Sequence, residues 1–159
     1  MSDELWMNSV FSLKLRLATL PDADRISVLS DRLGYPTTEA QMRERLQVLL
    51  RHDDHAIYVA TTEDDRAIAW IHVHRCYLAI EPTSAFILGL IVDEEYRGCG
   101  AGRRLVECGE QWGKERGCDR IVVRSNIIRP AAHRFYQHLG YANIKQSMVF
   151  AKDLSVGAS

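Results

Sequence analysis

Three glycines alternate with other residues in the stretch EEYRGCGAGRRL, residues 94–105. Gly98, Gly100 and Gly102 stand just before a segment that reads as helix. Glycine is costly inside a regular element, so such a cluster marks backbone that adopts unusual dihedral angles or closely approaches a ligand. Free amides at a helix start carry partial positive charge, and the arginines on either side add to it. The expected ligand is an anion such as phosphate.

Two familiar phosphate-binding loops do not fit this stretch. A Walker loop needs Gly-Lys followed by Ser or Thr, but here Gly102 is followed by Arg103 and Arg104, with no hydroxyl to hold magnesium. A dinucleotide fingerprint needs a small residue where Arg103 stands, and a carboxylate after the next strand, where residues 124–126 read Arg-Ser-Asn. A tight turn flanked by solvated arginines remains the alternative that needs no ligand.

A strand must end at the glycines and a helix must begin there, and the sequence pattern predicts both. The apolar run Ala85–Val92 reads as a buried strand, and a helical apolar face follows the glycines until Gly117. Other strands are predicted over Ser12–Thr19, His55–Thr61, Ala67–Leu78, Asp119–Ser125 and Gln146–Lys152. Other helices are predicted over Pro21–Leu33, Thr38–Arg51 and Pro130–Leu139. This order predicts an α/β domain whose mixed sheet has one parallel crossover, at the glycines.

Composition excludes several classes of protein. The 159 residues fit one domain, residues 1–159, with loose ends at 1–9 and 154–159. Lys and Arg number 20 against 21 Asp and Glu, which argues against a nucleic-acid binder. The run 85–92 is far below the roughly 20 residues that span a bilayer, so no membrane association is expected. The cysteines show no metal-site spacing, and we expect reduced thiols in a cytoplasmic protein without a metal. They are Cys76, Cys99, Cys108 and Cys118.

A second segment, NIIRPAAHRFYQHLGY at residues 126–141, makes the interpretation specific. With the glycine stretch it resembles the GCN5-related N-acetyltransferase (GNAT) superfamily. That superfamily carries Arg/Gln-x-x-Gly-x-Gly/Ala after its fourth strand, and Asn, Ala and Phe-Tyr-x-x-Leu-Gly-Phe/Tyr around its last helix. The matching positions are Arg97, Gly100, Gly102, Asn126, Ala132, Phe135, Tyr136, Leu139, Gly140 and Tyr141. The resemblance implies an α/β (α+β) fold, with a mixed, mostly antiparallel central sheet of six to seven strands flanked by about four helices.

The resemblance implies acetyl-coenzyme A (acetyl-CoA) as co-substrate. Amides from Gly98 to Arg103 would wrap its pyrophosphate, because positions without side chains let the backbone approach. Gly89 inside a strand suggests a bulge that separates this strand from the next and admits the pantetheine arm. An amide near Leu90 or Ile91 would polarise the thioester carbonyl. The implied donor-binding residues are Leu90, Ile91, Val92, Arg97, Gly98, Cys99, Gly100, Ala101, Gly102, Arg103, Asn126 and His133.

Acid and base catalysis need further side chains. The resemblance implies Tyr136 as the general acid for the leaving thiolate, although its helical spacing also suits core packing. Glu81, in the loop before the fourth strand, is a candidate base. His72 and His74 share one face of their strand, so they line an acceptor pocket or a solvated sheet face. The run Asp93–Glu95 is expected to be solvated charge.

The resulting function is acetyl-CoA-dependent transfer of an acetyl group to a primary amine of a small molecule or peptide, by direct attack. The acceptor stays open among polyamines, amino-sugar antibiotics, amino acids and peptides. The alternative is a sensor that binds acyl-CoA without turnover, which would keep the glycine loop but need no general acid. The superfamily often pairs subunits through C-terminal strands, and Met148–Phe150 is apolar, so a homodimer is also expected.

Overall fold

The computed structural model describes residues 12–155, and the chain divides into two units, residues 1–124 and 125–159. The strands are β1 (Lys14–Leu17), β2 (His55–Thr61), β3 (Ala67–Cys76), β4 (Ser84–Val92) and β5 (Arg120–Val123). The helices of the first unit are α2 (Ala23–Arg32), α3 (Glu39–Leu49) and α4 (Ala101–Glu115), with 3₁₀ turns η1 (Leu20–Asp22) and η2 (Glu94–Tyr96). The second unit contains α5 (Pro130–His138).

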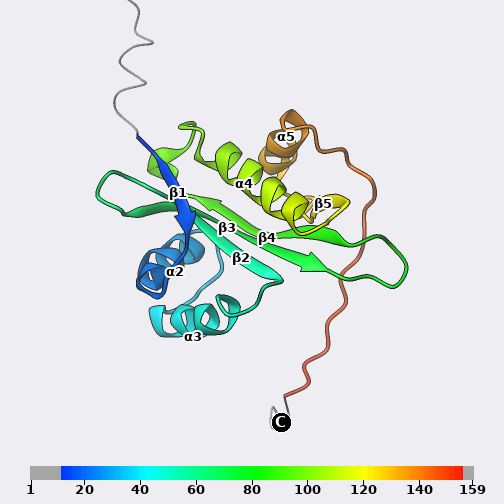
Figure 1. Ribbon diagram of the computed structural model, residues 1–159, viewed down its shortest axis with the longest axis horizontal. Coiled ribbons are helices and arrows are strands. Elements are labelled where there is room, and N and C mark those ends of the chain that lie inside the picture. Colours follow the sequence, from blue (N-terminus) through cyan, green and yellow to red (C-terminus); the bar gives the residue numbers. More distant parts are fainter. Residues whose placement is uncertain (1–11, 156–159) are drawn as a thin grey trace, which may run out of the picture. The chain divides into compact units, whose positions relative to one another are not determined.

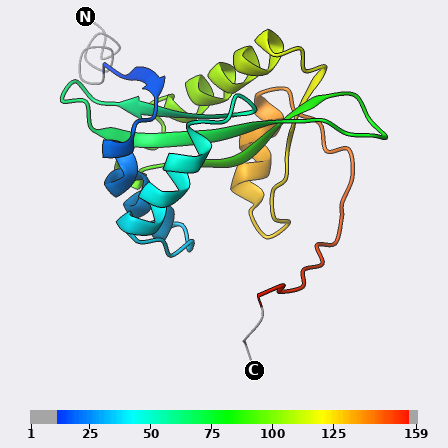
Figure 2. The same cartoon turned by 60° about the horizontal axis from the view of Figure 1, so that its bottom comes forward.

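The strands of the first unit form one sheet in the order β1-β2-β3-β4-β5 (Figure 1). The first four are antiparallel neighbours, and β5 runs parallel to β4. A parallel neighbour requires a crossover connection, and α4 supplies it. Helix α4 covers one face of the sheet, while α2 and α3 cover the other (Figure 2). The expected α/β class, with a mixed and mostly antiparallel sheet, is therefore confirmed.

The alternation of side chains along β2 and β3 divides the core between these two faces. Ile57 and Val59 belong to a buried cluster with residues of α2 and α3, and Trp70 packs against it. On the other face, the backbone of α4 lies close to β3. A Cβ atom added at Gly109 would come within 2.9 Å of Val73 Cγ1. A glycine therefore allows α4 to approach the sheet more closely than a larger residue would.

Residues 12–155 form fewer strands than expected, five in place of six to seven. The predicted strand Gln146–Lys152 is wrong, since residues 141–155 have no regular secondary structure. Met148, Val149 and Phe150 are instead 79%, 88% and 84% exposed. Strand propensity alone does not order a segment that has no strand to pair with. The expected loose end at residues 1–9 lies outside the described residues.

All four cysteines are free thiols. Within residues 12–155, no three histidine, cysteine or acidic side chains are placed to hold a metal ion. No helix in this part of the chain has the length and apolar character needed to cross a membrane.

Asp93 directly follows β4 and is 3% exposed, so the expectation that it belongs to a solvated run is wrong. Its carboxylate forms ion pairs with Arg25 at 3.1 Å and Arg32 at 3.2 Å, both on α2, and accepts the Glu95 N–H at 3.1 Å. Burial opposes the charged form, but these bonds hold the pKa of Asp93 below its usual range. The carboxylate thus ties the end of β4 to α2.

Replacing Asp93 with Asn should lower the free energy of unfolding by about 3 kcal/mol at pH 7, because the two arginines lose their buried partner. Since the folded-state pKa of Asp93 is lowered, its contribution is present above the unfolded pKa of about 3.9 and is lost as pH falls through the folded value. Urea unfolding at several pH values measures both effects. Glu94→Gln, at a neighbouring carboxylate that is 70% exposed, is the control and should change stability by under about 0.5 kcal/mol. Equal losses in both variants would contradict the assignment.

Candidate active site

The glycine turn joins η2 to α4 and has the backbone that only glycine adopts readily. Gly98 and Gly100 have φ angles of +82° and +87°, and Gly100 is the N-cap of α4. A Cβ atom built on either would meet no atom within 4 Å, so the turn is open on that side. Gly102 differs, because it is buried inside the first turn of α4 and has no positive φ.

The amide groups of this turn are arranged to bind an anion. The first amide used by the helix is that of Arg104, which donates to the Gly100 carbonyl at 3.1 Å, and the Cys99 amide donates to Tyr96 at 3.3 Å. Five amides find no acceptor in the described chain: those of Gly98, Gly100, Ala101, Gly102 and Arg103. Clustered N–H groups at a helix start bind phosphate groups through hydrogen bonds and the helix dipole. The turn therefore fits the pyrophosphate of acetyl-CoA.

The arginines beside the turn already have partners. Arg97 lies 3.7 Å from Glu94, Arg103 lies 3.0 Å from Glu107, and Arg104 donates to the Leu13 carbonyl at 3.0 Å. Exposed ion pairs contribute less than about 1 kcal/mol, so Arg97 and Arg103 can exchange their carboxylates for a phosphate. The permanent positive potential at this turn comes from the amides.

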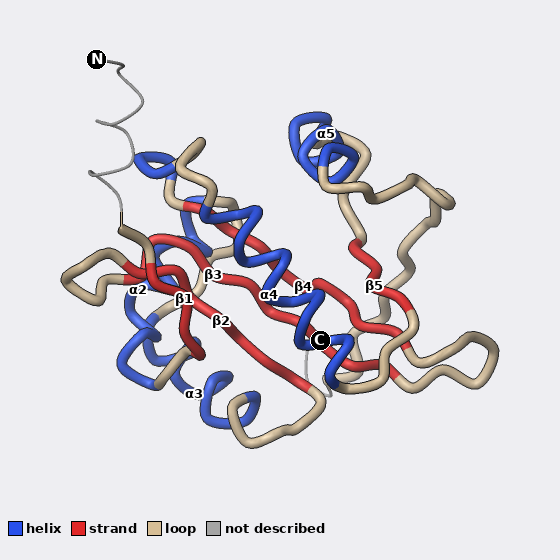
Figure 3. The backbone as a smooth tube through the Cα atoms, turned by 45° about the horizontal axis from the view of Figure 1, so that its top comes forward, coloured by secondary structure: helices blue, strands red, loops and turns tan. Residues whose placement is uncertain are grey.

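Strand β4 carries the irregularity expected at Gly89. His72 of β3 opposes Gly89, and the next residue, Val73, opposes Ile87, so Leu88 is an extra residue in β4. Strand β5 pairs only with residues 84–87 (Figure 3). The predicted bulge and separation are confirmed, one residue earlier than Gly89 itself. From Leu88 to Val92, the edge of β4 that faces away from β3 has no strand partner within residues 12–155.

The open edge of β4 and the glycine turn follow each other along the chain. Leu90, Ile91 and Val92 lie on the open edge, η2 follows, and the free amides begin at Gly98. An exposed strand edge can bind an extended ligand through main-chain hydrogen bonds. Ten of the twelve predicted donor-binding residues therefore lie in one continuous segment, residues 90–103.

The other two predicted donor-binding residues belong to the second unit, where their polar groups have local partners. Asn126 Oδ1 accepts the Ile128 N–H at 3.1 Å, and the Asn126 carbonyl lies 2.8 Å from His133 Nε2. Asn126 is thus a turn residue before α5.

Tyr136 lies in α5, next to two other aromatic rings. Its ring contacts Phe135 and Tyr141 edge to face, with centroids 5.1 and 5.6 Å away. The hydroxyl makes no hydrogen bond to any residue in the described chain. Burial raises the pKa of Tyr136 to about 12, so the phenol is protonated at pH 7.

Glu81, the candidate base, lies beyond the amino end of β4 and forms an ion pair with Arg120 at 3.1 Å. The bulge at Leu88 is four strand residues further along than Ser84, or about 13 Å. The structure therefore does not bring Glu81 to the bulge.

The two predicted histidines have a neighbour that the sequence did not indicate. His72 and His74 share the sheet face of Trp70, and His55 of β2 opposes His74 in the register. His55 Nδ1 lies 2.9 Å from His72 Nε2, and the His55 ring stacks on His74 at 4.2 Å. The short connection predicts that these two strands pair as a hairpin. It does not give the register, which is what places His55 opposite His74. Burial lowers the pKa of His72 to about 4 and also lowers that of His55.

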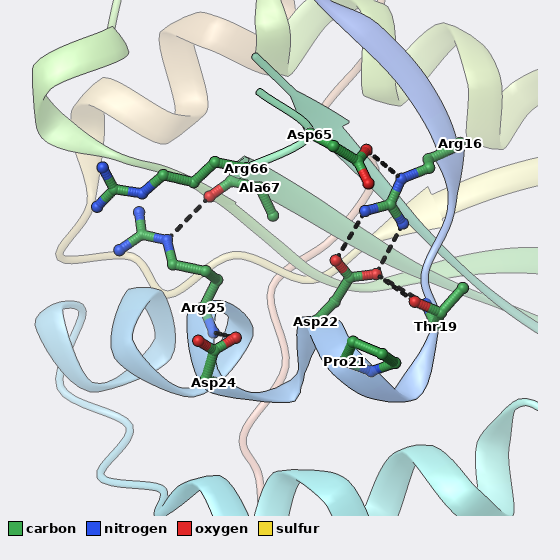
Figure 4. Close-up of a pocket in the computed structure, with 9 residues that line it drawn as sticks. All are labelled: Arg16, Thr19, Pro21, Asp22, Asp24, Arg25, Asp65, Arg66 and Ala67. Carbon is green, nitrogen blue, oxygen red and sulfur yellow. Dashed lines mark hydrogen bonds and ion pairs between the residues drawn. The ribbon is translucent and has the colours of Figure 1, made fainter. Parts of the chain in front are cut away.

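A polar cavity of about 440 Å³ lies at the start of α2, and three of its charged side chains, Arg16, Asp22 and Asp65, bond to one another (Figure 4). Arg16 holds Asp22 through two bonds of 2.7 and 2.8 Å and reaches Asp65 at 2.9 Å. Despite its burial, Asp22 has a pKa below the usual range because Arg16 bonds to it. This network joins β1, the β2–β3 connection and α2, which is a structural role.

Comparison with known proteins identifies the family. The model of the acetyltransferase (GNAT) family matches residues 23–141, three quarters of the chain. The chain belongs to this family. The GNAT domain is similar to an aminoglycoside N(6')-acetyltransferase type 1 of Acinetobacter genomosp. 13, with 25% identity over 80% of this chain and 94% of that protein.

Two solved structures have the same fold as this GNAT chain. A transcriptional regulator from Bacillus halodurans superposes with a TM-score of 0.81 at 22% identity, over 89% of this chain and 100% of the other. The aminoglycoside N-acetyltransferase AAC(6')-Iy in complex with CoA superposes with a TM-score of 0.80 at 16% identity, over 89% and 95%. The GNAT chain is an acyltransferase with acetyl-CoA as co-substrate and an amine as acceptor.

Proposed function

We propose that the acceptor is a primary amine of a small molecule, and that an amino sugar of the aminoglycoside type is the first candidate. Two features support acetyl-CoA as the donor in this proposal: the open edge of β4 and the five free amides that follow it along the chain. The acceptor half rests on the relative from Acinetobacter, which is named for acetylation of an aminoglycoside and aligns over nearly its whole length. A cytoplasmic location stays a prediction.

The residues of the first unit would act on the donor in a definite order. The amides from Gly98 to Arg103 hold the pyrophosphate, and the pantetheine arm lies along the open edge of β4. Successive residues of a strand direct their N–H groups to opposite sides, so one of Leu90 and Ile91 directs its amide away from β3. That amide donates to the thioester carbonyl oxygen, and the bond strengthens as attack makes the oxygen negative. Such a contact is worth about 3–4 kcal/mol.

Tyr136 supplies the acid in this proposal. As the amine forms the C–N bond, the C–S bond breaks and the thiolate of coenzyme A leaves. A reference thiol has a pKa of about 8.5, well below the value of about 12 for Tyr136. Full proton transfer to sulfur is therefore uphill, and the phenol acts first as a hydrogen-bond donor to the thiolate. A phenol that stays protonated suits this role.

Thiol release with a panel of amines tests the proposal. The panel contains an aminoglycoside, a polyamine, an amino acid and a peptide, and the same aminoglycoside with its amines already acetylated is the blank. We expect release with the free aminoglycoside and none with the blank. Binding of acetyl-CoA by calorimetry, without release for any amine, would instead support the sensor.

We also propose a homodimer in which a second copy covers Met148, Val149 and Phe150. Their exposure leaves an apolar surface in an extended segment. Light scattering should give the mass of a dimer for the parent, and Val149→Asp should shift it to a monomer. Ile80→Asp changes a residue that is 92% exposed elsewhere and should leave the mass unchanged. A parent that is monomeric at high concentration would remove the proposal.

A further inference from the structure

His72 lies opposite Gly89 at the bulge of β4, and Gly89 precedes Leu90 and Ile91, one of whose amides is proposed to bind the thioester carbonyl oxygen. Gly89 is next to the extra residue of β4. Opposed residues of antiparallel strands have Cα atoms about 4.5–5.5 Å apart. On the same face, Trp70 packs over Gly89, because a Cβ atom there would lie 2.8 Å from the indole. The side chains that border the bulge on the face of α2 and α3 are therefore Trp70 and His72.

His72 is joined to a second imidazole that lies farther from the bulge. The bond of 2.9 Å uses Nε2 of His72 and Nδ1 of His55. His55 opposes His74, two residues along β3 from His72, and His52 approaches it edge to face at 6.1 Å. The pair therefore leads from the bulge toward the start of β2, where His52 is exposed.

The other ring nitrogen of His72 is available to a ligand. Nδ1 has no hydrogen-bond partner among residues 12–155. Nδ1 is also not fully buried. Among residues 12–155, the one side-chain nitrogen or oxygen that is fully buried and has no hydrogen-bond partner is Trp70 Nε1. His72 Nδ1 can therefore accept a hydrogen bond from a ligand that reaches this ring.

We propose that His72 is the general base of the acetyl transfer and that His55 carries the proton onward to solvent. This inference rests on the proposed function and adds the group that receives the proton of the acceptor amine. It replaces Glu81, whose carboxylate is engaged by Arg120 at the amino end of β4.

The proton balance is complete with these two residues. The neutral amine attacks the carbonyl carbon, the C–N bond forms, and the nitrogen becomes positively charged. Its proton passes to His72 Nδ1, the Nε2 proton of His72 passes to His55 Nδ1, and the Nε2 proton of His55 passes to water. The hydrogen bond persists with its direction reversed. The pair is restored before the next turnover when His72 Nδ1 gives its proton to solvent, His55 Nδ1 returns its proton to His72 Nε2, and His55 Nε2 takes a proton from water.

The surroundings of His72 and His55 favour transfer of the proton from His72 to His55. Burial holds the pKa of His72 near 4, so its ring is neutral at pH 7, can accept a proton and does not retain it. His55 and His74 add to this effect. For His55, burial, His74 and His52 lower the pKa, but Asp54 opposes them. The Asp54 carboxylate therefore favours a positive charge on His55 rather than on His72.

Single and double variants, assayed with acetyl-CoA and the amine that the parent acetylates, test the relay. His72→Gln should lower kcat at pH 7 by about 100-fold, within the range of general-base catalysis. His55→Gln should lower it by about 10-fold, and the double variant should be no slower than His72→Gln, because the residues act as one unit. The KM for acetyl-CoA and the melting temperature should change little. His138→Gln, at an exposed histidine of α5 outside this sheet face, is the control and should keep at least half of the parent kcat.

Two further measurements separate catalysis from structure. The kcat of His72→Gln should rise with pH as hydroxide replaces the base, and added imidazole should restore activity to His72→Ala. A loss that is equal at every pH and that imidazole does not restore would overturn the proposal, as would an unchanged kcat in folded His72→Gln. If His72→Gln fails to fold, His55→Gln decides by the same criteria. A parent that acetylates no amine would overturn both this inference and the proposed function, whereas an active parent with unaffected variants would overturn the relay alone.

Discussion

Gly100→Glu is expected to abolish binding of acetyl-CoA while the protein stays folded. Gly100 opens α4 with a φ of +87°, and a Cβ atom there would meet no protein atom within 4 Å. The new side chain therefore extends into the space in front of the free amides. Its carboxylate occupies the position of the pyrophosphate and repels it. Calorimetry should detect no binding heat at coenzyme concentrations that saturate the parent.

Gly117→Glu is a matched control for this prediction. Gly117 has a φ of +73°, also meets no atom within 4 Å, and follows the other end of α4, about 22 Å away. It brings the same charge and a similar backbone strain of about 1–2 kcal/mol. Both variants should lose similar stability, but only Gly100→Glu should lose affinity. If the affinity of Gly100→Glu equals that of the parent, the glycines form a tight turn and nothing more.

Tyr136→Phe is expected to lower kcat by about 100- to 10,000-fold and to leave the Kd for acetyl-CoA nearly unchanged. The substitution removes one hydroxyl and keeps the ring that packs against Phe135 and Tyr141. The melting temperature should therefore stay close to that of the parent. Because the pKa of Tyr136 is raised to about 12, its phenol should keep its proton between pH 7 and 10. Deprotonation of Tyr136 should therefore not lower the parent kcat in this pH range.

The measurement must use the true acceptor, because background hydrolysis of acetyl-CoA bypasses the step in question. Tyr77→Phe removes a hydroxyl from a tyrosine that is 66% exposed and serves as the control. A parent-like rate in Tyr136→Phe would assign this tyrosine to packing and would mean that the thiolate takes its proton from water.

The backbone geometry of the proposed donor site could be predicted from sequence because its signals are local. Positive φ at Gly98 and Gly100 follows from the spacing of glycines, and the bulge follows from Gly89 within an apolar strand. The bounds of β2 were predicted as observed, since HAIYVAT is a short β-rich, apolar run between polar segments.

The features that sequence did not reveal depend on distant residues. The burial of Asp93 requires Arg25 and Arg32, which lie more than sixty positions away in the chain. The link between His55 and His72 requires the register of the β2–β3 pair, and a one-residue shift would separate the rings. Gln146–Lys152 has strand composition, but composition does not provide a pairing partner.

The packing of α4 has a consequence for how the coenzyme binds. The helix that presents the free amides lies on the sheet through Gly109, close to Val73, and Gly113, whose Cβ position is 3.1 Å from Ala85. These contacts fix the helix axis over the same sheet that contains the open edge of β4. The proposed anion site is therefore preorganised, and binding need not order the helix. Little conformational entropy is lost at this end of the coenzyme, so a larger share of the contact energy appears as affinity.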